Sequence, residues 1–74
     1  MLCTIKWLDD YDWEWENSFD STDAANAFCH KMLKKNAEAG DPKWTQPISV
    51  QYLDGATYES NDWLDLAKAI TKWR

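Results

Sequence analysis

Apolar and polar residues alternate along two stretches near the N-terminus, residues 2–8 and 13–19, and this alternation constrains the fold more than any other feature. A period of two is typical of half-buried strands. The side that we expect to be buried carries Cys3, Ile5, Trp7, Trp13, Trp15 and Phe19. Both apolar sets share one face only if the connecting loop has an odd number of residues. We therefore predict a three-residue loop at 8–10 or 9–11.

An amphipathic helix is predicted to follow these strands. Asp20 or Ser21 can cap its first amides, and Gly40 followed by Pro42 ends it. Its apolar stripe has the spacing of a helix and consists of Ala25, Phe28, Cys29, Met32 and Leu33. Residues 43–47 then form a linker.

The second half of the chain repeats this plan. We expect the alternation of Ile48, Val50 and Tyr52 to form a strand whose ring-bearing side also carries Tyr58. A two-residue turn at Asp-Gly would mix the two faces, so a three-residue loop 53–55 with a left-handed Gly55 is preferred. Residues 61–74 are predicted to form a second helix. Its inward residues are Trp63, Leu66, Ala67 and Ile70.

These elements predict one compact domain over residues 1–74, an α+β two-layer sandwich in the order ββαββα. The four strands form one antiparallel sheet, ordered 2-1-3-4, with both helices on one face. Residues 4–9 align with 49–54 at an offset of 45, which suggests a pseudo-repeat of ββα units, 1–40 and 46–74. Chance similarity between two strands of the same role is the alternative.

The formal net charge of −5 argues against simple attraction to a phosphate backbone or an anionic membrane, and points to a basic or neutral partner. Seven acids and no base lie in residues 9–23. The chain shows neither the pattern of a secretion signal nor an apolar run long enough to span a membrane. Two cysteines, Cys3 and Cys29, are too few for a disulfide scaffold, so we predict a reducing cytoplasm.

Residues 9–16, DDYDWEWE, combine five carboxylates with three rings. If the rings face the helices, the acids face outward, and Asp12, Glu14 and Glu16 form a ladder along the strand. The outward face is then expected to carry Thr4, Lys6, Glu14, Glu16, Ser18, Ser49, Gln51, Thr57 and Glu59. These acids either keep the hairpin soluble and discourage edge-to-edge pairing, or form a docking surface for a basic protein.

Other chemistries fit the sequence poorly. Strand alternation spreads the acids along a line, whereas calcium and magnesium need converging oxygens. A glycosidase acid pair needs a cleft, and a zinc site at Cys29 and His30 lacks further ligands. The sequence therefore predicts no metal, no cofactor and no enzymatic activity. Direct nucleic-acid binding is not expected, because the rings and the acids occupy opposite faces.

The sequence thus predicts a non-enzymatic acidic protein-binding module, of the kind that phages and mobile elements use as inhibitors of host proteins, such as anti-CRISPR proteins. This step rests on size, acidity and missing catalytic chemistry, which is analogy. The predicted contact residues are Asp9, Asp10, Asp12, Glu14, Glu16 and Trp44. The alternative is a structural or regulatory homodimer, joined through an exposed sheet edge or through the region of Trp44 and Trp73.

Overall fold

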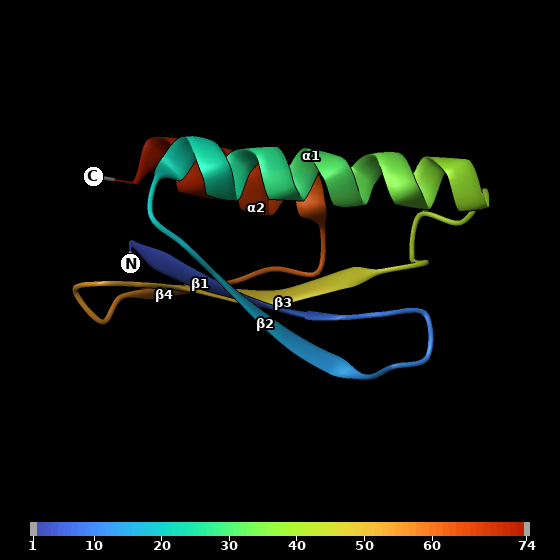
Figure 1. The fold of residues 1–74 in the computed structure, drawn as a ribbon, viewed down its shortest axis with the longest axis horizontal. Coiled ribbons are helices and arrows are strands. Elements are labelled where there is room, and N and C mark those ends of the chain that lie inside the picture. The colour runs from blue at the N-terminus through green and yellow to red at the C-terminus, as the bar shows by residue number, and fades with distance from the viewer. Residues whose placement is uncertain (1, 74) are drawn as a thin grey trace.

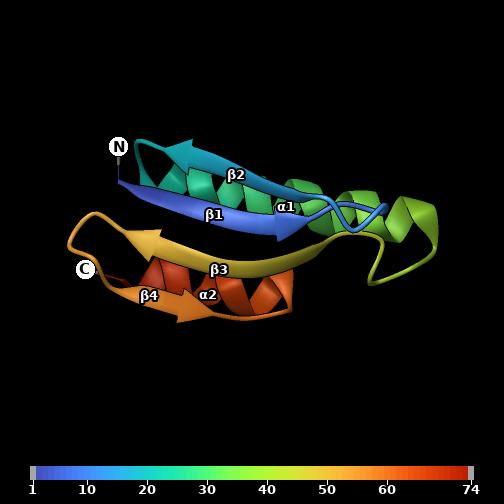
Figure 2. The same ribbon diagram turned by 90° about the horizontal axis from the view of Figure 1, so that it is seen from below.

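The computed structural model describes residues 2–73 as two layers, a sheet and a pair of helices. The elements follow the order β1 (Cys3–Leu8), β2 (Glu14–Phe19), α1 (Thr22–Ala39), β3 (Gln46–Tyr52), β4 (Thr57–Glu59) and α2 (Trp63–Lys72). The antiparallel sheet has the strand order β2-β1-β3-β4. Both helices lie on the same face (Figures 1 and 2). The predicted fold class and strand order are confirmed.

Both helices begin and end where local chemistry favours it. Ser21 caps α1, because its hydroxyl oxygen accepts a hydrogen bond from the amide of Ala24. Gly40 closes α1 in the left-handed conformation, with φ of 72°. Asp62 caps α2 through the amide of Leu64, so α2 starts slightly later than predicted. Arg74, predicted to belong to α2, lies outside the described residues.

The two hairpins have the predicted parity, although the first turns later than expected. Val50 pairs with Tyr58 across a three-residue loop 53–55, and Gly55 has φ of 93°, as predicted. In the first hairpin, Trp7 pairs with Trp15. The amide of Asp9 donates to the carbonyl of Trp13 at 3.0 Å, so the loop is 10–12 rather than 8–10 or 9–11. This loop is favoured because the carboxylate of Asp9 accepts the amides of Tyr11 and Trp13. Asp12 takes the left-handed position in it, with φ of 63°.

One expected face assignment in β3 is wrong. Ile48 was predicted on the helix-facing side, but it lines a shallow hollow of the open face, of about 400 Å³, together with Lys6 and Glu59. The register between β1 and β3 shifts at Lys6 and Trp7, so Ile48 has no partner in β1 and its side chain moves to the open face. Pro47 is buried instead. Its missing amide proton costs no ladder bond to β4, which pairs only with residues 49–51.

The core lies between the sheet and the two helices. Its fully buried side chains, each at most 2% exposed, are Cys3, Ile5, Cys29, Val50, Trp63, Leu66 and Ile70. The ring of Phe28 packs edge-on against Trp7 and Trp63, with centroids 5.8 Å away in each case. At the other end of the core, Trp73 stacks on Tyr52 at 4.4 Å. Trp73 is therefore packed against the core.

Candidate functional site: the hairpin end

The loop of the first hairpin is organised by one carboxylate, that of Asp9. Its Oδ1 accepts the amides of Tyr11 at 2.8 Å and Trp13 at 3.0 Å, and its Oδ2 accepts the indole N–H of Trp15 at 2.8 Å. These bonds hold the pKa of the Asp9 carboxyl below its ordinary value. The bond from Trp15 lowers it most, and the two amides lower it further. Asp9, predicted as a contact residue, therefore uses its carboxylate to shape the loop.

The aromatic side chains of this hairpin are more exposed than the alternation predicts. Tyr11 is 78% exposed, Trp13 69% and Trp15 51%. Trp15 does lie on the same side of the sheet as Trp7, and the two rings stack at 6.1 Å. The expectation that the helices cover Trp13 and Trp15 is nevertheless wrong, because the first hairpin twists away from the helical layer towards its loop (Figure 1).

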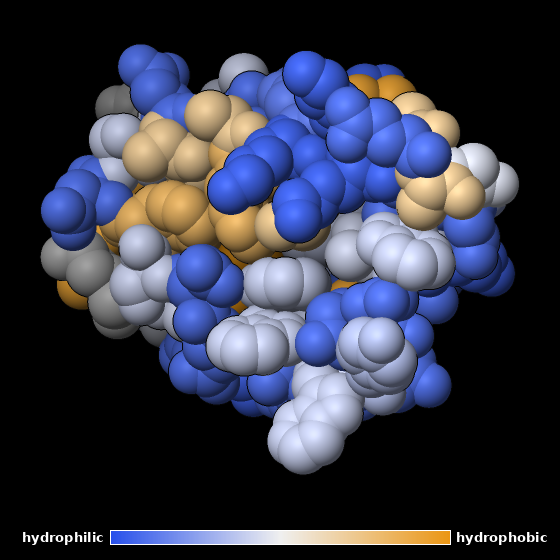
Figure 3. Space-filling view, turned by 45° about the vertical axis from the view of Figure 1, so that its right-hand side comes forward, coloured by the Kyte–Doolittle hydropathy of each residue, from blue (hydrophilic) through white to orange (hydrophobic). Residues whose placement is uncertain are grey.

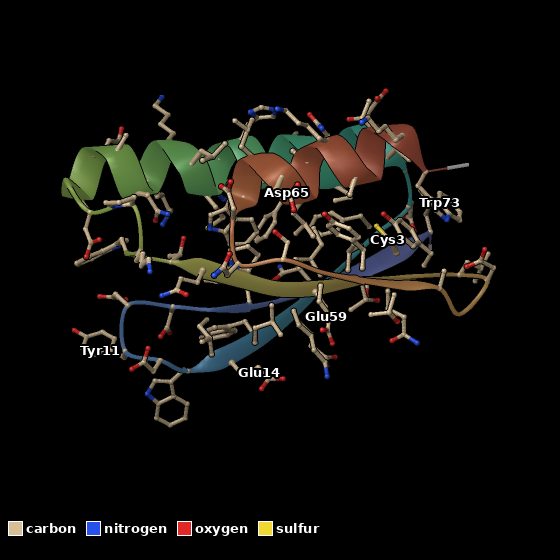
Figure 4. All side chains as sticks on the ribbon, turned by 180° about the vertical axis from the view of Figure 1, so that it is seen from behind. Cys3, Tyr11, Glu14, Glu59, Asp65 and Trp73 are labelled. Carbon is tan, nitrogen blue, oxygen red and sulfur yellow. The ribbon has the colours of Figure 1, made fainter. Side chains whose placement is uncertain are left out.

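The acids of the segment are exposed but do not form the predicted ladder. Glu14 and Glu16 belong to β2 and point away from the helices, as Figure 4 shows for Glu14. Asp12 lies in the left-handed turn before β2, outside that row. The ammonium of Lys6 lies 3.8 Å from Glu14 and 3.9 Å from Glu16, so it offsets part of the charge of the row. Both pairs are largely solvent-exposed and are worth little in stability.

Trp44 is 40% exposed, and its loop is held by a buried polar network that the sequence did not predict. The neighbouring Thr45 donates its amide and its hydroxyl to the Asn36 side-chain oxygen, at 2.8 and 2.9 Å. Asn36 donates to the carbonyls of Pro42 and Thr45, and the indole of Trp63 also donates to the Thr45 carbonyl. Trp44 is thus presented by a loop that is pinned to the core.

The loop with Trp44 and the first hairpin loop lie at the same end of the molecule. Leu8, the last residue of β1, pairs with Gln46, the first of β3, so both loops emerge beside each other. Figures 1 and 2 show them together at the end opposite the loop 53–55. We call this region the hairpin end; its members are residues 9–16 and Trp44.

The surface around the hairpin end mixes rings with charge. In Figure 3, pale side chains of intermediate hydropathy project from the lower part of the molecule among hydrophilic ones.

Trp44 and Trp73, predicted as one region, lie at opposite ends of the molecule. Trp73 is at the far end from Tyr11 in Figure 4, whereas the loop with Trp44 lies beside the loop of the first hairpin. The two residues therefore do not form one compact patch.

Metal-binding clusters and activated thiols are two features that can support catalysis. Among residues 2–73, no group of three histidine, cysteine or acidic side chains could hold a metal ion. Burial raises the pKa of Cys3, and it raises that of Cys29 to about 12, so both thiols stay protonated at neutral pH. Neither helix of this part of the chain is long and apolar enough to cross a membrane.

None of the protein families, curated proteins and solved structures compared with the chain matches it.

Proposed function

We propose that this protein is a non-enzymatic binding module whose hairpin end docks on a basic surface of another protein. One observation carries the proposal: four exposed rings, Tyr11, Trp13, Trp15 and Trp44, lie at the same end as the exposed acids Asp10, Asp12, Glu14 and Glu16. Tryptophan and tyrosine are the residues most often found as energetic anchors of interfaces.

The rings and the acids have complementary roles in such a contact. Exposed carboxylates steer a positively charged partner towards the hairpin end and raise the rate of association. The rings then supply buried area, and their faces attract the guanidinium groups of arginine. Because the rings share this end with carboxylates, the same surface repels phosphate groups. The partner is accordingly a basic protein and not a nucleic acid.

Two of the four rings, Trp15 and Trp44, are restrained before a partner arrives. The Asp9 carboxylate fixes the indole of Trp15, and the network of Asn36 and Thr45 fixes the loop that carries Trp44. Less side-chain entropy is then lost on binding. Trp13, the most exposed of the tryptophans, is expected to contribute the largest part of the affinity.

Two narrower predictions, on the mode of action and on the place of action, belong to this proposal. A basic site that normally holds nucleic acid would fit an acidic competitor, which is the mode of action expected of an anti-CRISPR or another anti-defence inhibitor encoded by a phage or mobile element. Its place of action would be the cytoplasm, a proposal that rests on two unpaired thiols, Cys3 and Cys29.

The homodimer alternative is tested by sedimentation at two protein concentrations. A monomer at both concentrations would remove it, whereas a mass that doubles with concentration would favour it.

The experiment for the proposed function is a pull-down from bacterial lysate at low and high salt. The wild-type protein should capture a basic protein that is lost at high salt, because salt screens exposed charges. A variant with Asp12→Asn, Glu14→Gln and Glu16→Gln should fail to capture it. The matched control changes Asp23, Glu38 and Asp54, three exposed acids elsewhere, to Asn, Gln and Asn. Equal capture by both variants would refute the proposal.

The contribution of the rings is tested separately. Trp13→Ala should release the captured protein, whereas Leu53→Ala, which removes a 70% exposed apolar side chain from the opposite end, should not. Equal retention by both variants would show that the rings are not the anchors.

A further inference from the structure

Strand β2 is an open edge of the sheet. Among the described residues it pairs only with β1, and no strand lies on its other side (Figure 2). The bond from the amide of Asp9 to the carbonyl of Trp13 sets the phase of the ladder between β1 and β2. Odd-numbered residues of β2 bond to β1, so the backbone groups of Glu14, Glu16 and Ser18 point to the open side.

This edge lacks several features that usually prevent strand addition. Natural edges are commonly protected by proline, a bulge, shortness or charged side chains, above all lysine. The charges of β2 are the acids Glu14 and Glu16, which repel an acidic strand but attract a cationic one. Residues 14–19 contain no proline or lysine, and their pairing with β1 has no register shift. The opposite edge, β4, is only three residues long, whereas β2 has six. Of the two edges, β2 is therefore the one that can accept a further strand.

Like charges disfavour the pairing of this edge with a second copy of the same chain. A two-fold antiparallel pairing centred on Glu16 places Glu16 opposite itself. Centring it on Trp15 sets Glu14 opposite Glu16, and centring it on Asn17 sets Glu14 opposite Asp20. Carboxylates directly opposite each other destabilise a sheet, whereas a cation opposite a carboxylate stabilises it.

We infer that β2 accepts an extended segment of the basic partner as a fifth strand of the sheet. The segment has arginine or lysine at alternate positions, opposite Glu14 and Glu16 on the open face. The residues between them contact the side of the sheet that carries Trp15 and Phe19, where Trp15 is half exposed. This inference rests on the proposed function and specifies how the partner is held: backbone bonds supply affinity, and the acids select a cationic segment.

The test uses a synthetic peptide in which arginine and threonine alternate. Binding should slow hydrogen exchange at the amides of Glu14, Glu16 and Ser18 by at least about tenfold, because these amides gain partners. The amides of Trp15 and Asn17 already face β1 and should change less. A peptide of the same composition, with its arginines and threonines in separate blocks, should bind more weakly because it cannot match the alternation.

Two variants at one position isolate the backbone bond. Ser18→Pro removes the outward amide of an exposed edge residue, whose loss an edge strand tolerates. Ser18→Ala is the matched control, since both variants lose the hydroxyl bond to Thr4. Peptide affinity should fall by about tenfold or more in Ser18→Pro relative to Ser18→Ala.

Several results would overturn the inference. They are failure of the alternating peptide to bind, binding without protection at residues 14, 16 and 18, and equal affinity of the two Ser18 variants. The proposed function would survive each of them if the lysate protein were still captured in a manner that depends on Asp12, Glu14, Glu16 and Trp13. Loss of that capture dependence would remove the proposed function itself.

Discussion

The first hairpin turns at residues 10–12 and the second at 53–55, and each places its third loop residue at positive φ, Asp12 at 63° and Gly55 at 93°. Their surroundings differ. The second hairpin is tied to the helices, because Tyr52 stacks on Trp73 and the hydroxyl of Tyr58 donates to Asp65 at 2.7 Å. The first extends beyond the helical layer and leaves Tyr11 and Trp13 exposed. Similar local chemistry thus yields a structural hairpin and one available for contact.

The largest expected difference in stability between the two hairpins comes from a matched pair of tyrosines. Tyr52, in the second hairpin, is 6% exposed, whereas Tyr11 is 78% exposed. Tyr52→Ala should lower the free energy of unfolding by about 3 kcal/mol, because it removes a packed ring. Tyr11→Ala should change it by less than about 0.5 kcal/mol. Urea denaturation followed by circular dichroism measures both, and similar costs would break the comparison.

The buried network beside Trp44 gives the next largest effect. Asn36→Ala leaves the amide and hydroxyl of Thr45 without their acceptor, so stability should fall by about 2 kcal/mol. Asn26→Ala on the same helix removes bonds from a partly exposed site to Ala67 and Thr71, and should cost about 1 kcal/mol. An equal or larger loss for Asn26 would show that the network does not pin the Trp44 loop.

The two turns can be compared by exchanging their third residues. Gly55→Asp should cost about 1 kcal/mol, because a side chain is strained at this φ. Asp12→Gly should gain about 0.5 kcal/mol by relieving that strain, partly offset by a more flexible unfolded chain. Thermal unfolding measures both changes. A loss on Asp12→Gly would mean that the side chain of Asp12 stabilises the hairpin.

The smallest effect is a pH dependence confined to the first hairpin. The pKa of Asp9 is lowered by folding, so its ionised form stabilises the protein above the unfolded pKa, near 3.8, and this contribution is lost as the pH falls through the folded pKa. The stability difference between wild type and Asp9→Asn should therefore be complete at neutral pH and shrink in acid. Asp10→Asn is the control for charge. A difference that grows in acid would contradict the assignment.

Much of the fold follows from local patterns, since alternation, caps and glycine positions act over a few residues. Ser21 and Gly40 set the ends of α1. The odd loop length that keeps Val50 and Tyr58 on one face sets the register of the second hairpin. Neither depends on the tertiary structure. The bulge at Ile48 was not predictable in this way, because it depends on how β1 and β3 meet. Asn36 could have been noticed, since it continues the helical spacing of Ala25, Cys29 and Met32.

The candidate site was predicted in composition but not in geometry. The acids at positions 10, 12, 14 and 16 are exposed as expected. The exposure of Trp13 and Trp15 was missed, because period-two alternation says which side of the sheet a ring takes but not whether a helix reaches it. Sheet twist and hairpin length decide that coverage. The structural role of Asp9 could not be predicted, because its bonds to Tyr11, Trp13 and Trp15 depend on the turn conformation.

We propose that the exposed rings of the hairpin end serve contact, and that Trp13, the most exposed of the tryptophans, contributes little to stability. The most direct test measures Trp13→Ala twice, for its affinity towards the captured basic protein and for its free energy of unfolding. We predict that affinity falls at least about tenfold, while the free energy of unfolding changes by less than about 0.5 kcal/mol. Unchanged affinity together with a loss of several kcal/mol in stability would contradict the account.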